Sequence, residues 1–194
     1  MSSETNETKK RILQAAWELM EAHRGQDISM NAIAKSVGIS RQAVYLHYSS
    51  RTELMIETMK YVDDVKGLNA RLERLEEAST GIELIDIFVD VWGNYIPEIY
   101  GLAKALLRTR DTDEAMAAAW DTNMSCLREV CEKIIDMLEE EGALASQWSK
   151  DEATELLWAM LSITNWEQFI YECGWSNTQY VDGMKKLLRQ TLIE

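Results

Sequence analysis

Apolar residues recur every three or four positions along nearly the whole chain, which is the spacing of one face of an α-helix. The first such stripe consists of Ile12, Ala15, Ala16 and Leu19. It predicts a helix over about Thr8–His23, ended by Gly25. Nine Gly and one Pro among 194 residues are too few for the frequent turns of a β-sandwich or barrel. The pattern therefore predicts an all-α fold of about nine helices.

Two later predictions concern helix length. Apolar positions continue from Arg51 to about Leu75 and predict one long amphipathic helix. The next stripe begins after Gly81 and meets Pro97, which lacks an N–H and clashes with the preceding turn. We therefore expect that helix to stop near Pro97 and a shorter one to follow.

The C-terminal part is predicted to hold two further helices. Between Asp151 and Cys173, apolar residues lie on more than one side, so a helix there must be covered on more than one side. Gly174 is expected to end it. Asn177 or Thr178 is expected to cap the final helix.

The most informative stretch runs from Ser29 to Arg51, with the sequence SMNAIAKSVGISRQAVYLHYSSR. Ser29 is placed to cap a short helix from Met30 to about Ser36, and Ser40 to cap a second over Arg41–Tyr48. Gly38 lies where the chain must turn sharply between them. Two short helices joined by a turn that contains Gly are typical of a helix-turn-helix, whose second helix lies in the major groove of DNA.

The second short helix carries side chains that suit DNA. Arg41 can bind guanine O6 and N7, and Gln42 can pair with adenine N6 and N7. Hydroxyl or imidazole donors for phosphate are supplied by Tyr45, His47 and Tyr48, and Arg51 is the expected phosphate clamp at the start of the next helix. The alternative is a helical hairpin whose polar residues are simply solvated.

The distribution of charge supports the first interpretation. The net charge of −13 argues against nucleic acid when taken for the whole chain. Residues 1–60, however, hold 8 Lys+Arg and 7 Asp+Glu, a net of +1, which leaves −14 for the remainder. No acidic residue lies between Ile28 and Thr52. The pattern indicates a small DNA-facing module on an acidic body.

The motif resembles that of the TetR (tetracycline-repressor-like) family of bacterial transcription regulators. The resemblance covers about Arg11 to Leu54, and it is most specific in the spacing of Ile33-Ala34, Gly38-Ile39-Ser40 and Val44-Tyr45. It implies DNA-facing roles for Ser29, Arg41, Gln42, Tyr45, His47 and Tyr48. Arg51 stands where the family usually has Lys, and Tyr48 where Phe is frequent.

The resemblance also implies an organisation and a mechanism. Residues 1–52 would form the DNA-binding domain, and residues 53–194 would bind a small-molecule effector and dimerise. The last two helices would pair with those of a second copy into a four-helix bundle. Two recognition helices would then read a palindromic operator with half-sites about 34 Å, one DNA turn, or a multiple of it apart. The expected function is a repressor that its effector releases.

Aromatic residues in the C-terminal part are the candidates for the effector site. These are Trp92, Tyr95, Trp120, Trp158 and Trp166. Rigid rings with one polar edge suit a pocket for an aromatic or lipophilic ligand, and nearby carboxylates would suit a cationic one. The alternative is that these rings pack in the core or in the dimer interface.

Other classes of function lack the residues they need. A di-iron helical enzyme requires Glu-x-x-His pairs, and Met20 and Val44 precede His23 and His47 by three. The Gly residues are scattered, so neither a phosphate-binding loop nor a Gly-x-Ser-x-Gly elbow is present. We therefore expect no catalysis, metal or cofactor, and we expect no membrane span and a cytoplasmic location. A helical scaffold that does not bind DNA stays open.

Overall fold

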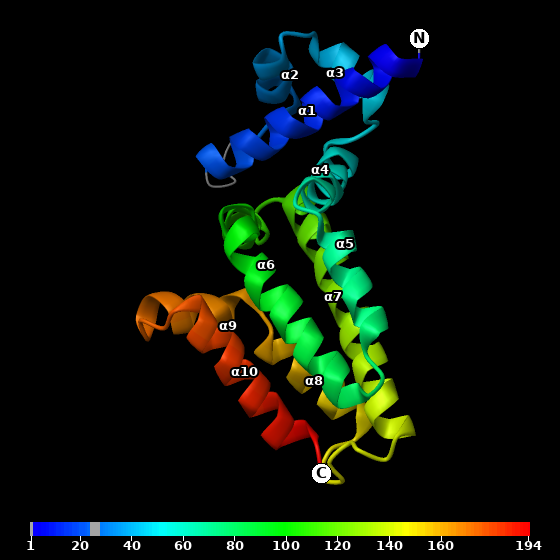
Figure 1. Ribbon diagram of the computed structural model, residues 1–194. Helices are drawn as coiled ribbons and strands as arrows, with labels where there is room; N and C mark the ends of the chain where they lie inside the picture. The colour runs from blue at the N-terminus through cyan, green and yellow to red at the C-terminus, as the bar shows by residue number, and fades with distance from the viewer. Residues whose placement is uncertain (1, 24–27) are drawn as a thin grey trace. The chain divides into compact units, whose positions relative to one another are not determined.

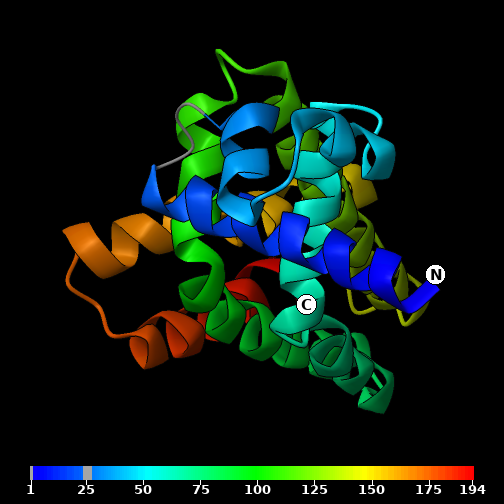
Figure 2. The same ribbon diagram turned by 90° about the horizontal axis from the view of Figure 1, so that it is seen from above.

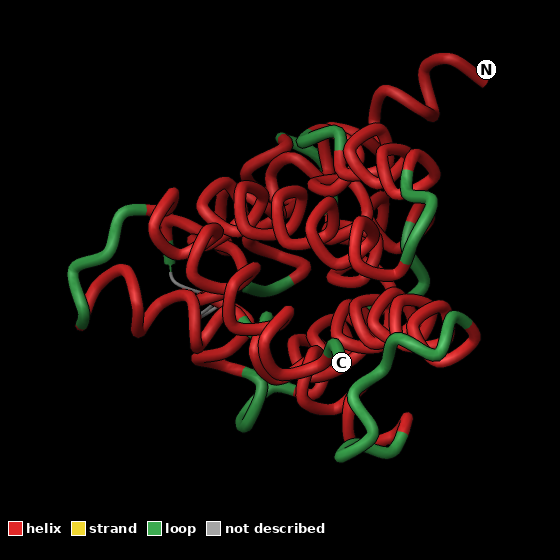
Figure 3. The backbone as a smooth tube through the Cα atoms, turned by 60° about the horizontal axis from the view of Figure 1, so that its bottom comes forward, coloured by secondary structure: helices red, strands yellow, loops and turns green. Residues whose placement is uncertain are grey.

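The computed structural model describes residues 2–23 and 28–194, so Gly25 lies outside the described residues. Over that part of the chain it shows ten α-helices, one 3-10 helix and one π-helical segment (Figures 1 and 3). The same residues contain no strand, only an isolated bridge between Leu144 and Ile193. The all-α prediction is confirmed, with ten helices in place of about nine. None of the described helices is long and apolar enough to cross a membrane.

The helices form two compact units. The first contains the chain up to Lys66 together with Ile99–Met124, and the second contains Gly67–Glu98 and Ser125–Glu194. Two helices, α6 (Gly81–Thr109) and α7 (Glu114–Glu140), have residues in both units. The ends of α6 and α7 on either side of residues 110–113 thus belong with the N-terminal helices. The functional division at residue 52 remains a prediction.

Four helices make up the N-terminal part of the first unit: α1 (Ser2–Ala22), α2 (Met30–Val37), α3 (Arg41–His47) and α4 (Arg51–Val65). Helix α1 packs against both α2 and α4, and α2 packs against α3 (Figures 1 and 2). Three of the four residues predicted for the stripe on α1 are buried, with Ile12 and Ala16 fully inaccessible, and Leu19 is half-buried. The Arg11 guanidinium donates to the Val37 carbonyl at 2.7 Å and so satisfies an oxygen at the end of α2.

The prediction of one helix from Arg51 to Leu75 is wrong. Helix α4 ends at Val65, and Gly67 follows with a φ of +69°, in the left-handed region. Only Gly adopts this conformation without a steric cost from Cβ, and it interrupts the helical path. The chain continues in the second unit as α5 (Leu68–Leu72) and a 3-10 helix over Glu73–Glu77.

The prediction of a break at Pro97 is also wrong, because α6 continues through it. Proline in a helix interior costs about 3 kcal/mol through the lost hydrogen bond and the clash. The neighbouring side chains Tyr95, Ile96 and Ile99 are buried, and each gains about 1.5–3 kcal/mol on leaving water. Burial on both sides of Pro97 therefore outweighs its cost.

The region from Asp151 to Cys173 is not a single helix as predicted. It forms α8 (Lys150–Met160), α9 (Ile163–Glu167) and a π-helical turn over Gln168–Glu172. The break follows from Ser162, whose hydroxyl accepts the Asn165 N–H at 3.2 Å and starts a new helix.

The end of this region and the start of the last helix are closer to expectation. Gly174 has a φ of +71°, as expected of the residue that ends a helix. Helix α10 (Asn177–Leu192) is capped by Ser176, and neither Asn177 nor Thr178 is the cap. Ser176 and Gln179 form a reciprocal capping box, which satisfies two backbone donors at once.

Two glycines of α6 have different surroundings, and they generate a stability prediction. A Cβ at Gly93 would lie 2.8 Å from Val181 Cγ2 on α10, whereas a Cβ at Gly101 would find its nearest atom, Glu21 Oε1, at 3.4 Å. Val181 is branched and buried, so it has little freedom to move. The absent side chain at Gly93 is therefore what lets α6 and α10 approach.

We expect Gly101→Ala to raise the free energy of unfolding by about 0.5–1 kcal/mol, because Ala favours a helix over Gly. Gly93→Ala gains the same propensity but overlaps Val181, and overpacking costs about 1–3 kcal/mol, so its net effect should be a loss. Urea titration followed by circular dichroism measures both. A Gly93→Ala protein as stable as the Gly101→Ala protein would contradict the close packing.

Candidate nucleic-acid interface

Three serines set the starts of the helices around the predicted motif. Ser29, Ser40 and Ser50 are the N-caps of α2, α3 and α4, and each hydroxyl accepts the backbone N–H three residues later at 3.0–3.1 Å. A serine cap stabilises a helix start by about 1 kcal/mol relative to Ala. The predicted caps at Ser29 and Ser40 are confirmed, and both short helices end within one residue of their predicted bounds.

Gly38 makes the turn between α2 and α3. Its φ of +78° lies in the left-handed region, and its N–H donates to the carbonyls of Ala34 at 3.0 Å and Lys35 at 3.3 Å. The next N–H, of Ile39, also donates to Ala34, at 3.0 Å. The end of α2 is thereby closed with its carbonyls satisfied, and the chain reverses into α3 as the motif predicts.

Helix α3 has one buried and one exposed face. Val44 is fully inaccessible and anchors the helix on the core. The exposed face consists of Arg41, Gln42, Tyr45 and Leu46. This face holds three of the predicted DNA-facing residues together at the N-terminal and central part of the helix, where a recognition helix contacts base edges.

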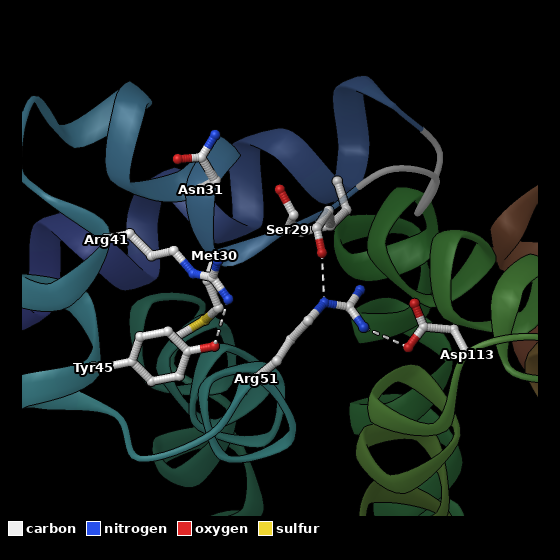
Figure 4. A pocket seen from close by; sticks show the side chains of 8 residues that line it. Ser29, Met30, Asn31, Arg41, Tyr45, Arg51 and Asp113 are labelled. Carbon is white, nitrogen blue, oxygen red and sulfur yellow. Dashed lines mark hydrogen bonds and ion pairs between the residues drawn. The ribbon is translucent and has the colours of Figure 1, made fainter.

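Arg41 and Tyr45 are held together one helical turn apart. The guanidinium of Arg41 lies 5.5 Å from the centre of the Tyr45 ring, and its Nη2 donates to the phenol oxygen at 3.4 Å (Figure 4). Stacking of this kind restricts the rotamers of a long side chain before it meets a ligand. The pair thus presents a partly ordered cation and a hydroxyl on the exposed face.

Leu46 is a candidate that the sequence analysis did not select. Its side chain is 82% exposed, although leucine is usually buried. It lies between the two polar positions Tyr45 and His47, and an apolar side chain there is suited to contact the methyl group of thymine. Its place two residues after the inward Val44 is the signal that would have identified it.

The side chains of Tyr48 and His47 are less exposed than those of the exposed face of α3. Tyr48 is 4% exposed, and burial, with the carboxylates of Glu57 and Glu53, raises its pKa to about 12. The ammonium of Lys9 on α1 lies 5.9 Å from its ring centre. His47 is half-buried. Tyr48 therefore packs beneath the motif, and a contact of its hydroxyl with phosphate remains a prediction.

The guanidinium of Arg51 is bound to protein oxygens on two sides. Its Nε donates to the Ile28 carbonyl at 2.5 Å, and its Nη1 donates to Asp113 Oδ1 at 2.5 Å (Figure 4). Burial alone would raise the pKa of Asp113, but the hydrogen bond and charge of Arg51 outweigh it and lower the pKa. Whether Arg51 also clamps a phosphate remains a prediction.

A surface hollow of about 590 Å³ adjoins the start of α2 and helix α3. The guanidinium groups of Arg41 and Arg51 line it, together with the capping serine Ser29 and the phenol of Tyr45 (Figure 4). Donors from α2, α3 and α4 therefore converge on one site. Asp113 is the acidic group among the residues that line the hollow.

Comparison with known proteins agrees with this arrangement. The sequence family described as "Bacterial regulatory proteins, tetR family" matches residues 12–58, which include the whole motif. Over this segment the chain is of the TetR type. The nucleoid occlusion factor SlmA of Marinomonas sp. is 26% identical over 72% of this chain and 68% of its own length. The transcriptional regulator UidR of Escherichia coli is 32% identical over 52% of this chain, which spans about half of UidR.

Solved structures share the fold over nearly the whole chain. A putative transcriptional regulator from Saccharomonospora viridis, solved in complex with choline, covers 97% of this chain with a TM-score of 0.75 and 14% identity. NalD of Pseudomonas aeruginosa, a secondary repressor of a multidrug efflux pump, covers 98% with a TM-score of 0.71 and 18% identity. At these identities the likeness extends the TetR-type fold beyond residue 58, and it shows the fold alone.

The aromatic residues predicted for an effector site are mostly buried. The indole N–H of Trp92 donates to the Leu161 carbonyl at 2.7 Å, and that of Trp166 to Asn177 Oδ1 at 2.9 Å. Tyr95 is fully inaccessible, and the Arg71 guanidinium lies 5.5 Å from its ring centre.

The other two aromatic residues of that set differ in place and exposure. Trp158, on α8, is half-buried. Trp120 belongs to the first unit, with the other four in the second. The structure thus brings four of the five into one unit, and their role in binding an effector remains a prediction.

The cysteines and acidic residues add little chemistry. Cys131 is inaccessible, and burial raises the pKa of its thiol to about 12, so it packs as a small apolar residue, as predicted. Among the described residues, no three His, Cys, Asp or Glu side chains gather in a group that could hold a metal ion.

Arg41→Ala should weaken binding to an operator fragment by about 1–3 kcal/mol and relax the sequence preference at one position of each half-site, because it removes a bidentate base contact. Lys35→Ala, which removes the same charge from the exposed face of α2, is the matched control and should weaken all sequences equally. Fluorescence anisotropy with point-substituted operators measures both. Equal losses for the two variants on every sequence would contradict base recognition by Arg41.

Proposed function

We propose that this protein is a TetR-type transcriptional repressor that binds a palindromic operator as a homodimer and is released by a small-molecule effector. The observation that carries the proposal is the exposed face of α3, which consists of Arg41, Gln42, Tyr45 and Leu46. Val44 anchors this helix on the core, and Ser40 caps its start. A helix presented in this way supports insertion into the major groove.

The distribution of charge decides how such a protein meets DNA. The stretch from Ile28 to Thr52 has no acidic residue, whereas residues 61–194 carry a net charge of −14 against +1 for residues 1–60. The acidic body repels the phosphate backbone, so binding to unrelated DNA should be weak and should fall further with salt. Specific binding then depends on the few contacts that α2, α3 and the start of α4 supply.

Dimerisation through the C-terminal helices α8 and α10 is supported by apolar side chains that these helices leave partly uncovered. Leu187 on α10 is 39% exposed, and Leu156, Trp158 and Met160 on α8 are half-buried. Apolar side chains that a single chain does not cover favour association with a second copy. A two-fold axis there would give the dimer two copies of α3 for the two half-sites.

The effector is proposed to be an aromatic or lipophilic small molecule bound within the second unit. The relative from Saccharomonospora viridis was solved with choline, and NalD represses a multidrug efflux pump. For this chain, the rings of Trp92 and Tyr95, with centres 6.0 Å apart, lie together in the interior of the second unit, and paired aromatic rings are typical of pockets that bind such ligands. A coupling of about 1–3 kcal/mol between effector and operator would suffice for regulation.

The direct test is footprinting of the purified protein on the DNA upstream of its own gene. We expect a protected segment with two-fold symmetric sequence and half-sites one DNA turn, or a multiple of it, apart. Arg41→Ala protein at the same concentration is the control for protection that needs the recognition helix. Absence of protection by the wild-type protein even at low salt would rule out the proposal.

Leu187→Asp should shift the protein from dimer to monomer in sedimentation equilibrium and should reduce operator affinity, because a carboxylate in an apolar interface is costly to desolvate. Val65→Asp is the matched control: Val65 is 53% exposed, lies on α4 and is outside the proposed interface. A Leu187→Asp protein that remains dimeric would contradict the placement of the interface on α10.

A further inference from the structure

The two ends of the helix-turn-helix segment are joined through the guanidinium of Arg51. Arg51 is the first residue of α4, directly after the motif, and its Nε donates to the carbonyl of Ile28, directly before it. The bond joins two residues 23 positions apart and is partly buried. The segment that contains α2, the Gly38 turn and α3 is therefore closed into a loop at Arg51.

The same guanidinium is held from the other side by Asp113. Asp113 lies just before α7, in the short connection from α6, and it is 62 positions from Arg51 in the sequence. Its Oδ1 accepts from Arg51 Nη1 at 2.5 Å and also from the N–H groups of Ala115 and Met116 at 3.1 and 3.3 Å. The carboxylate is thus fixed by the first turn of α7, whose free N–H groups favour a negative charge.

The surroundings of the pair favour a well-defined geometry. The side chains of Arg51 and Asp113 are 25% and 26% exposed, so water screens them less than it screens an open surface pair. Ile28, whose carbonyl is the other acceptor, is buried, with 3% of its surface exposed. Three segments that are separated in the sequence therefore meet in one set of charge-assisted hydrogen bonds.

We propose that Asp113 is a positioning residue for DNA binding, and that its ion pair with Arg51 is the link by which the connection between α6 and α7 sets the position of the helix-turn-helix. The inference rests on the proposed function and adds to it the residue through which the site is regulated. Displacing Asp113 displaces Arg51, and with it both ends of the segment that carries α3. Asp113 need not touch DNA to act in this way.

This proposal and simple electrostatics predict opposite changes in operator affinity when the charge of Asp113 is removed. Asp113 is an acidic group beside a surface that should meet phosphate, so removing its charge should tighten DNA binding if charge alone matters. If Asp113 positions the motif, removing it should weaken operator binding instead. Asp113 also caps α7, so the variants must distinguish the effect of losing the ion pair with Arg51 from the effect of losing the cap.

Two substitutions make that separation. Asp113→Ser keeps a good N-cap but is too short to reach Arg51, and Asp113→Asn keeps both a cap and one uncharged acceptor for Arg51. Asp111→Ser is the matched control: it removes the same charge two residues away from a side chain that is 87% exposed and whose ion-pair partner is the neighbouring Arg110. Thermal melts followed by circular dichroism report whether each variant remains folded.

Operator affinity is measured by fluorescence anisotropy on the fragment that the wild-type protein protects. We expect Asp113→Ser to weaken binding about 10-fold, a size typical of coupling between sites. Asp113→Asn should fall between that variant and the wild type, and Asp111→Ser should bind as well as the wild type or slightly better. Without DNA, hydrogen exchange at the first turn of α2 should be faster in Asp113→Ser than in Asp111→Ser.

Wild-type affinity or tighter binding for both Asp113 variants would overturn the proposal, because Asp113 would then act only as a repelling charge or as a competitor for Arg51. That result would leave the proposed function intact, since the wild-type protein still binds its operator. A wild-type protein that protects no DNA would remove the proposed function and this inference together.

Discussion

The left-handed turn at Gly38 is the constraint on which the DNA-binding surface depends. It lets the chain reverse within two residues while the carbonyls at the end of α2 remain hydrogen-bonded. A side chain at that position would cost about 1–2 kcal/mol and would favour a wider turn. Because Val44 must reach the core from α3, the direction of this turn decides which residues of α3 face outward. The exposed face with Arg41 and Leu46 follows from it.

The acidity of the protein takes on a different meaning once it is mapped on the fold. A net charge of −13 would oppose any docking on DNA if it were spread evenly. The acid-free stretch from Ile28 to Thr52 instead coincides with α2, α3 and the start of α4. Repulsion elsewhere limits the orientations in which the protein can approach a duplex. The charge pattern therefore acts on specificity more than on strength.

Local features of the fold could be predicted from the sequence, and long-range ones could not. The caps Ser29 and Ser40, the Gly38 turn and the stripe on α1 depend on residues within a few positions of one another, and the structure agrees with each. The continuity of α6 through Pro97 depends on burial that no local pattern reveals. The ion pair of Arg51 joins residues 62 positions apart, so a single sequence holds no sign of it.

The residues of the candidate site likewise divide into those that the sequence predicted and those that it missed or misplaced. Arg41 and Gln42 were predicted from the chemistry of base contacts and Tyr45 from that of phosphate contacts, and all three are exposed on α3. Leu46 was missed because polarity was taken as the sign of a DNA contact, although thymine offers a methyl group. Tyr48 was selected for its hydroxyl, and its ring turned out to pack beneath the motif.

Pro97 gives the two longest helices different mechanical properties. Proline has no N–H for the carbonyl of Gly93, so α6 lacks one rung of its hydrogen-bond ladder close to the point where its residues pass from one unit to the other. Bending stiffness is lowest at such a point. Helix α7 contains neither Gly nor Pro along its length, and it begins at the cap that Asp113 provides. Of the two, α6 therefore contains the interruption, and α7 is a helix without Gly or Pro from its cap at Asp113 to Glu140.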